Sequence, residues 1–290
     1  MNMEIIIYGT INSLILLFMS AGFALAYSVS RVPNFTHGAL YVLGGYLNWM
    51  LLNHFGVHYG LSILISTFSV AAFGWLIYQL FVIRVRGMQL SEILVTFAVA
   101  LAILEFLRWH GLRGSTFVLP SFYSGTIDVF GVIVDYQRVF VMIAAIGIVI
   151  ALHLFTHYTK IGLGLRAIAQ NERAALLLGI NSDRSAALAL GLGSALAALA
   201  GITIFPLGNI NVATGYDVLI LAISVCICGG LGSWKGTVLA AFVLGFAQIA
   251  VVHFVAPQYG ILVSLMAVIL ILIFKPSGLY GQQKDLEERV

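Results

Sequence analysis

The chain has 290 residues, of which 61% are hydrophobic and 9% are charged, and its formal net charge is +3. A water-soluble domain usually has about a quarter of its residues charged. This composition excludes an ordinary soluble protein and indicates that lipid is the main solvent around the chain. The modest net charge gives no reason to expect a nucleic-acid partner.

Apolar runs of membrane length predict an all-α, polytopic membrane protein with about 8–9 transmembrane helices in one domain, residues 1–290. Runs of about 20 residues favour helices over the shorter alternating strands of a membrane barrel. The candidate spans are Ile5–Tyr27, Thr36–Phe55, Tyr59–Ile83, Leu90–Arg108, Val139–Tyr158, Ala186–Pro206, Tyr216–Ser233, Gly236–Ala256 and Tyr259–Lys275.

Lysine and arginine are distributed unevenly between the two sets of alternate loops. One set carries all of the 14 basic residues except Arg108, Arg113 and Arg138. The richer set should be cytoplasmic, which places the C-terminus inside and, with nine spans, the N-terminus outside. The N-terminal half of this topology depends on whether Arg31–Gly38 is a loop between spans or an unwound stretch within the membrane.

The longest segment on the outer side, about residues 111–138, has two interpretations. Its alternating residues Thr126–Tyr136 could form a short hairpin where an outer partner docks. The segment could equally be a plain connecting loop.

The cytoplasmic loop Lys160–Arg184 is too long for a tight connection and has a helical pattern of its own. Arg166, Gln170 and Arg173 recur at i, i+4 and i+7, so they share one face of a helix. Gly179 is a suitable stop, and Ser182 or Asp183 can cap the next span. The pattern predicts a short surface helix, which could anchor the loop at the membrane, simply connect two spans, or contact a cytoplasmic partner.

Polar residues near the second span suggest a translocation path. Pro33 and Gly38 interrupt helix formation, and Asn34, Thr36 and His37 add polar groups beside the break. Unwound backbone at membrane depth persists only where protein buries it or where it lines a wet cavity. The alternative is an interfacial turn capped by Asn34.

Charged and metal-ligating residues within the spans give one further candidate for the path. Glu105 is a charged residue in a predicted span, and such residues are functional hypotheses by default. Arg108 at i+3 offers an alternative, a helical ion pair near the outer end. His153 and His157 have a spacing that suits a metal, but no third ligand is evident, so no metal site is predicted.

Small residues mark two packing features. Gly193, Ala197 and Gly201 recur every four residues and predict a close contact with another helix, within the chain or across an interface with a second protein. The glycines of residues 229–236 predict a tight corner between two spans.

Motifs for nucleotide binding and catalysis are missing from the sequence. It contains no G-x-x-x-x-G-K-[ST] phosphate loop, no H-E-x-x-H and no G-x-S-x-G. The chain is therefore predicted not to be an enzyme and to bind neither ATP nor another cofactor.

Four sequence blocks in order resemble one known family. Glu172, Ala174, Ala175 and Gly179 resemble the EAA loop of ATP-binding-cassette (ABC) importer permeases, and the wider loop is similar to that of the LivH/LivM family of branched-chain amino acid permeases, closest to the LivH type. Three further blocks agree with that family: Pro33–Tyr46 (PNFTHGALYVLGGY), Cys228–Gly245 (CGGLGSWKGTVLAAFVLG) and Lys275–Gly281 (KPSGLYG). Where the family usually has Glu-Asp in the loop, this chain has Gln170 and Asn171, and an acidic position of the eighth span is Gln248.

The resemblance implies a multi-pass permease subunit in the cell (inner) membrane, surrounded by lipid. Its expected partners are a second, LivM-like permease, two ATP-binding subunits that hydrolyse ATP, and an extracytoplasmic solute-binding protein. It also implies that the loop couples transport to ATP hydrolysis; the coupling residues would be Arg166, Gln170, Glu172, Arg173, Ala174, Ala175 and Gly179.

Two questions about function stay open at this stage. The substrate could be branched-chain amino acids, other amino acids, amides or urea. A protein of another class, a self-sufficient secondary transporter or channel, would need an ion site in the spans, for which Glu105, Asp217 and His37 are the candidates.

Overall fold

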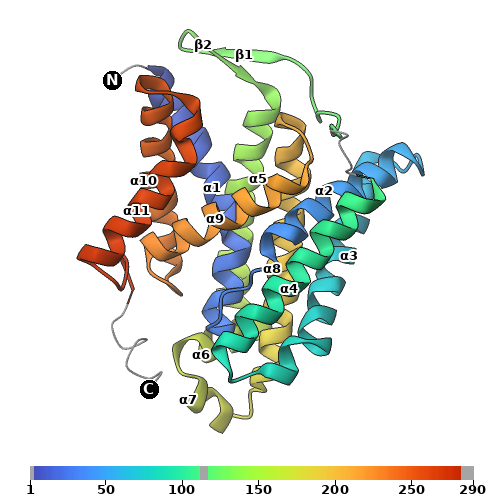
Figure 1. The fold of residues 1–290 in the computed structure, drawn as a ribbon, viewed down its shortest axis with the longest axis vertical. Coiled ribbons are helices and arrows are strands. Elements are labelled where there is room, and N and C mark those ends of the chain that lie inside the picture. Colours follow the sequence, from blue (N-terminus) through green and yellow to red (C-terminus); the bar gives the residue numbers. More distant parts are fainter. Residues whose placement is uncertain (1–2, 112–116, 282–290) are drawn as a thin grey trace.

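The computed structural model describes residues 3–111 and 117–281 as a bundle of helices with one small hairpin (Figure 1). The longer helices match the predicted spans to within a few residues. Their bounds are α1 Met3–Ser30, α2 His37–Asn53, α3 Tyr59–Leu80, α4 Gln89–His110, α5 Tyr136–Tyr158, α8 Ser182–Ile204, α9 Val212–Gly229, α10 Trp234–Phe254 and α11 Gly260–Phe274.

Shorter elements connect these helices. Two short helices, α6 Lys160–Gln170 and α7 Glu172–Leu177, lie between α5 and α8, and single 3-10 turns are η1 Val82–Val85, η2 Phe205–Leu207 and η3 Pro257–Tyr259. Within the described residues, eight helical segments are long and apolar enough to cross a membrane. The second predicted span is the exception, because α2 has only 17 residues.

The two ends of the bundle differ. At one end, β1 (Thr126–Val129) pairs antiparallel with β2 (Val132–Asp135), so the short hairpin predicted for these residues is present. Val132 and Val134 pack on Ile11 of α1, and the Tyr8 hydroxyl donates to the Ile133 carbonyl at 2.7 Å. We call this the hairpin end. The opposite end, which holds α6, α7 and the last turn of α1, is the α7 end (Figure 1).

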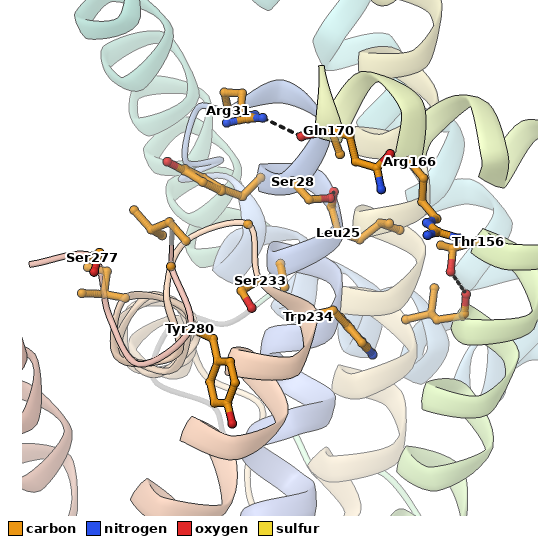
Figure 2. A pocket seen from close by; sticks show the side chains of 18 of the residues that line it. Leu25, Ser28, Arg31, Thr156, Arg166, Gln170, Ser233, Trp234, Ser277 and Tyr280 are labelled. Carbon is orange, nitrogen blue, oxygen red and sulfur yellow. Dashed lines mark hydrogen bonds between the residues drawn. The ribbon is translucent and has the colours of Figure 1, made fainter. Parts of the chain in front are cut away.

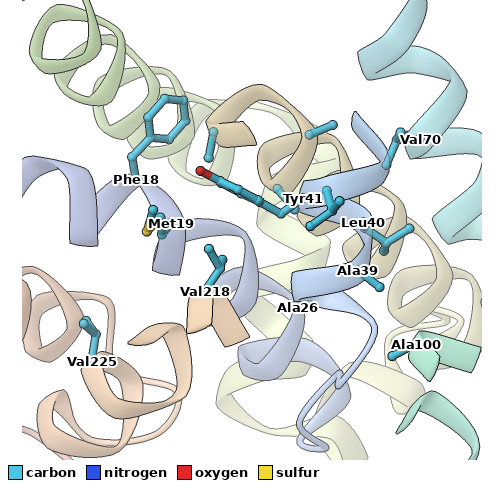
Figure 3. Packing of buried hydrophobic residues seen from close by; sticks show 14 of the residues in the cluster. Phe18, Met19, Ala26, Ala39, Leu40, Tyr41, Val70, Ala100, Val218 and Val225 are labelled. Atoms are coloured by element: carbon cyan, nitrogen blue, oxygen red, sulfur yellow. The ribbon is translucent and has the colours of Figure 1, made fainter. Parts of the chain in front are cut away.

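The core is centred on α1 and α8, whose apolar windows are 67% and 72% buried inside the chain. Small residues allow the close approach: a Cβ added at Gly193 of α8 would lie 2.7 Å from the Gly22 carbonyl oxygen of α1. The predicted small-residue face therefore packs within the chain. Larger buried side chains such as Phe18, Leu40 and Tyr41 fill the space around it (Figure 3).

Two helices take little part in that core. Only 11% of the apolar window of α5 is buried, and only 6% of the window that contains α11. Because both are apolar, their outer faces need a cover of lipid or another protein.

The predicted glycine corner joins α9 to α10 at the α7 end. Gly230 and Gly232 have positive φ angles of 101° and 82°, which favour glycine. The segment after α11 docks on this corner, since the amides of Leu279 and Tyr280 donate to the carbonyls of Cys228 and Gly229, each at 2.9 Å. Two sequence blocks from distant parts of the chain thus form one structural unit.

Candidate functional site

The predicted surface helix of the loop Lys160–Arg184 is divided in two. Asn171 has an extended backbone (φ −156°, ψ 101°) and caps α7, because its Oδ1 accepts the Ala174 amide at 3.0 Å. An asparagine at this position ends α6 and begins α7 by offering the backbone an alternative hydrogen bond. The helical face expected for Arg166, Gln170 and Arg173 is interrupted before it reaches Arg173.

A charged network holds α7 against the ends of α3 and α8. The Arg86 guanidinium, just after η1, bonds Glu172 Oε1 at 3.0 Å and Ser182 Oγ at 2.5 Å. It also pairs with Asp183 of α8, and Ser182 Oγ donates to Glu172. The Tyr78 hydroxyl of α3 donates to Asp183 at 3.3 Å. Glu172, a predicted coupling residue, therefore has partners within the chain.

Three leucines are exposed at the C-terminal end of α7, of which Leu178 is the C-cap. Ala175 is buried, whereas Leu177 and Leu178 are 90% and 79% exposed and Leu176 is half-exposed. Gly179 follows at φ 81°, the left-handed conformation that commonly ends a helix. Arg173 and Ala174 are exposed on the same helix. The sequence prediction missed these leucines, although three consecutive leucines in a loop between spans are a usable signal.

Arg166 and Gln170, the other two predicted coupling residues, lie away from this leucine surface. They line a cavity of about 650 Å³ at the α7 end, between the ends of α1 and α5, the glycine corner and the segment after α11 (Figure 2). Arg31, the residue that follows α1, contacts α6 there, because its guanidinium donates to the Ala169 carbonyl at 2.5 Å.

The three polar residues that precede and begin α2 lie deep in the bundle rather than at its end. His37 Nε2 is 2.8 Å from the Met19 carbonyl oxygen in the middle of α1. Met19 precedes the last residue of α1, Ser30, by eleven residues, which is roughly 16 Å of helix. The chain therefore turns back after α1 and starts α2 about halfway along the bundle.

Several polar groups of this re-entrant segment, residues 31–36, form hydrogen bonds with one another. Asn34 Oδ1 accepts the Thr36 amide at 3.0 Å and the Thr36 hydroxyl at 2.5 Å. The Phe35 amide donates to Thr96 of α4 at 3.4 Å. Asn34, Thr36 and His37 are all buried, and none of them lines the 650 Å³ cavity. The fold thus brings unwound backbone, a histidine and the starts of α2 and α9 to one place.

The remaining candidates have exposed side chains. Glu105 pairs with Arg108 at 2.9 Å, and both side chains are at least half-exposed. Asp217 is exposed on α9. His153 and His157 stack with ring centroids 4.0 Å apart, and within the described residues no group of three metal-ligating side chains occurs.

Comparison with known proteins identifies the family. The family model described as "Branched-chain amino acid transport system / permease component" matches residues 5–273. The chain belongs to this permease family. Its members are transmembrane subunits of ABC transporters without a catalytic domain, and the permease chain carries no cofactor.

Individual relatives of this permease are similar over nearly their whole length. It is 29% identical to the high-affinity branched-chain amino acid transport system permease protein LivH of Escherichia coli K12, covering 91% of this chain and 90% of the relative. It is 27% identical to the Pseudomonas aeruginosa permease BraD, over 91% of each chain. A probable LivH of Methanocaldococcus jannaschii is also 27% identical, over 93% of this chain and 90% of the relative.

One solved structure shares the fold. A chain of "PsaBC from Streptococcus pneumoniae in complex with Fab" superposes on this permease with a TM-score of 0.54, at 9% identity, covering 96% of this chain and 95% of that chain. The helix arrangement is therefore one that an experimentally determined protein adopts. Together with the family, it establishes the chain as a multi-pass membrane permease.

Proposed function

We propose that this permease imports branched-chain or closely related amino acids with energy from ATP hydrolysed on separate partner subunits. The names of the similar LivH and BraD proteins support that substrate class. An extracytoplasmic binding protein would deliver the amino acid, and a second permease subunit would complete the path. Amides, urea and other amino acids are the alternative substrates.

The observation that carries this proposal is the leucine surface at the C-terminal end of α7, residues 176–178. Leucines 90% and 79% exposed are costly in water. They lie at the end of the bundle whose loops carry most of the basic residues, so we assign that end to the cytoplasm. Exposed leucines on a short helix suit a groove on a cytoplasmic protein. The occupant we propose is an ATP-binding subunit.

The anchoring of α7 suggests how movement is transmitted. Arg86 links α7 to the end of α3 and to Ser182 and Asp183 of α8. Helix α8 in turn packs on α1 and α2 beside the re-entrant segment. A partner that moves α7 would therefore displace the central helix of the bundle. Alternating access needs two arrangements of this kind with different partner contacts.

The experiment is co-purification of the ATP-binding subunits with this permease. Leu177→Ser and Leu178→Ser together should abolish co-purification and stimulated ATP hydrolysis while leaving membrane insertion unchanged. Leu90→Ser is the matched control, because Leu90 is a 71% exposed leucine at the same end but on α4. Retention of the ATP-binding subunits by the double variant, at the level of the control, would refute the assignment of α7.

The substrate is tested separately by uptake into proteoliposomes that contain the full set of subunits. Radiolabelled leucine should be taken up, and unlabelled isoleucine and valine should compete with it. Competition by urea or an amide, with no effect of isoleucine or valine, would assign the permease to one of the alternative substrates.

A further inference from the structure

The 650 Å³ cavity at the α7 end is basic. Two arginines and two histidines line it, Arg31, Arg166, His153 and His157. None of the described residues that line it is acidic. The hydroxyls of Ser233 and Ser277 add hydrogen-bond donors, and Trp234 and Tyr280 add aromatic surface (Figure 2). The hydroxyls of Ser28 and Thr156 also line the cavity but already donate to the carbonyls of Leu25 and Leu152.

Arg166 is the cavity residue that points most directly to a ligand. Its side chain is half-buried, and within the part of the chain that the structure describes it has neither a hydrogen bond nor an ion pair. A half-buried guanidinium normally meets an acceptor, because removing it from water without one is costly. The cavity therefore has the chemistry of a site for an anion.

The cavity also opens towards the flank of the bundle. Its rim includes exposed residues of two helices, His153 and His157 of α5 and Leu272 of α11. Helix α5 packs on α1, α6 and α8, whereas α11 packs on α9 and α10. Between them, α5 and α11 present apolar faces that the chain leaves uncovered, with side chains such as Ile146, Ile150 and Ile269.

We propose that this cavity binds the headgroup of an anionic phospholipid from the cytoplasmic leaflet. The phosphate would meet Arg166 and the neighbouring hydroxyls, and the acyl chains would lie along the apolar flanks of α5 and α11. This combination of a basic pocket between helices and apolar walls above it matches an amphipathic anion better than a small water-soluble one. Trp234 and Tyr280 are residue types that favour the membrane interface.

The test uses the purified full chain in detergent and follows its thermal unfolding midpoint. Phosphatidylglycerol is titrated as the anionic lipid, phosphatidylcholine as the zwitterionic lipid, and glycerol phosphate as a soluble anion without acyl chains. Phosphatidylglycerol should raise the midpoint at the lowest concentration. Equal effects of the two lipids would overturn the proposal, and an equal effect of glycerol phosphate would assign the cavity to soluble anions instead.

Arg166→Gln should weaken the response to phosphatidylglycerol about tenfold, as expected for the loss of a hydrogen bond to a charged group. Arg173→Gln is the matched control, because it removes the same charge from the exposed surface of α7, outside the cavity lining. Equal weakening by the two variants would mean that only net charge matters, and the proposal would fail.

Two other occupants are separated by further measurements. A chain that ends at Gly281 lacks the acidic residues Asp285, Glu287 and Glu288; if the lipid response appears only in this shortened chain, the cavity belongs to that segment. The titration is also repeated on the assembled transporter in lipid nanodiscs, comparing the wild type with Arg166→Gln. Loss of the difference between them in the complex would mean that the second permease covers the cavity, which contradicts the proposal.

Discussion

Replacing Arg86 by glutamine tests whether the charged network fixes the position of α7. The wild-type guanidinium bonds Glu172 and Ser182 and pairs with Asp183. Without it, two carboxylates are left close together and α7 keeps only Ala175 as a buried side chain. The helix should then open more often, while the spans, which do not depend on Arg86 for their burial, stay folded.

The size of the effect follows from the exposure of the groups. The Arg86 side chain is 29% exposed, and those of Glu172 and Asp183 are 47% and 49% exposed. Ion pairs this accessible contribute about 0.2–1 kcal/mol each, so the loss of two should cost about 0.4–2 kcal/mol. That corresponds to a population of the open state that is about 2 to 30 times larger.

Amide hydrogen exchange is the suitable assay, because it reports local opening. The amides of Ala175, Leu178 and Gly179, which bond carbonyls within the α7 segment, should exchange faster by that factor in Arg86→Gln. Arg84→Gln is the matched control, since Arg84 is exposed on η1 and outside the network. A cycle with Glu172→Gln should give non-additive effects. Exchange no faster than in the Arg84 variant would refute the reasoning.

Three other changes probe the fold. Gly38→Ala should strongly lower the midpoint of thermal unfolding in detergent, because its Cβ would lie within 2 Å of the Gly215 carbonyl oxygen. Gly147→Ala on α5 is the control and should be neutral or stabilising, because nothing lies within 4 Å of its Cβ. Equal midpoints for the two variants would contradict the close packing at Gly38. Gln137→Leu should release the segment before β1, since buried Gln137 accepts a hydrogen bond from the Phe122 amide at 3.0 Å and donates one to the Thr203 carbonyl at 2.9 Å. The loss in stability should be about 1–3 kcal/mol. An unchanged rate of amide hydrogen exchange at Phe122 would argue against a role of Gln137 in holding this segment. Gln248→Leu removes the bridge from Asn12 to Ser264 and should cost about 1 kcal/mol, seen as a lower midpoint; an unchanged midpoint would mean that the bridge adds no stability.

The spans could be predicted from sequence because each depends on an uninterrupted apolar run, a local property of the chain. The depth at which α2 begins could not. It depends on the contact between His37 and the Met19 carbonyl and on the close approach of Gly38 to Gly215. These contacts join helices that are separate in sequence, so the break at Pro33 alone is compatible both with a turn at the membrane surface and with a re-entrant segment.

Only part of the candidate site could be predicted from sequence, for the same reason. The polar pattern and the family resemblance located the loop Lys160–Arg184, but one periodic face was assumed throughout, and the extended backbone at Asn171 interrupts it. The partner of Glu172 is Arg86, which is 86 positions away in sequence, and only the packing of α3 against α8 brings the two together. The leucine surface of α7 and the cavity lined by Arg166 are two separate sites, and this separation likewise becomes visible only in three dimensions.

The most direct test of the account is uptake into proteoliposomes, with the permease reconstituted alone or together with its partner subunits. ATP supplied on the side that corresponds to the cytoplasm should drive leucine uptake only when the ATP-binding subunits and the binding protein are present, and the paired substitution of Leu177 and Leu178 should abolish it. Uptake by this chain alone, driven by an ion gradient and indifferent to ATP, would contradict the central claim.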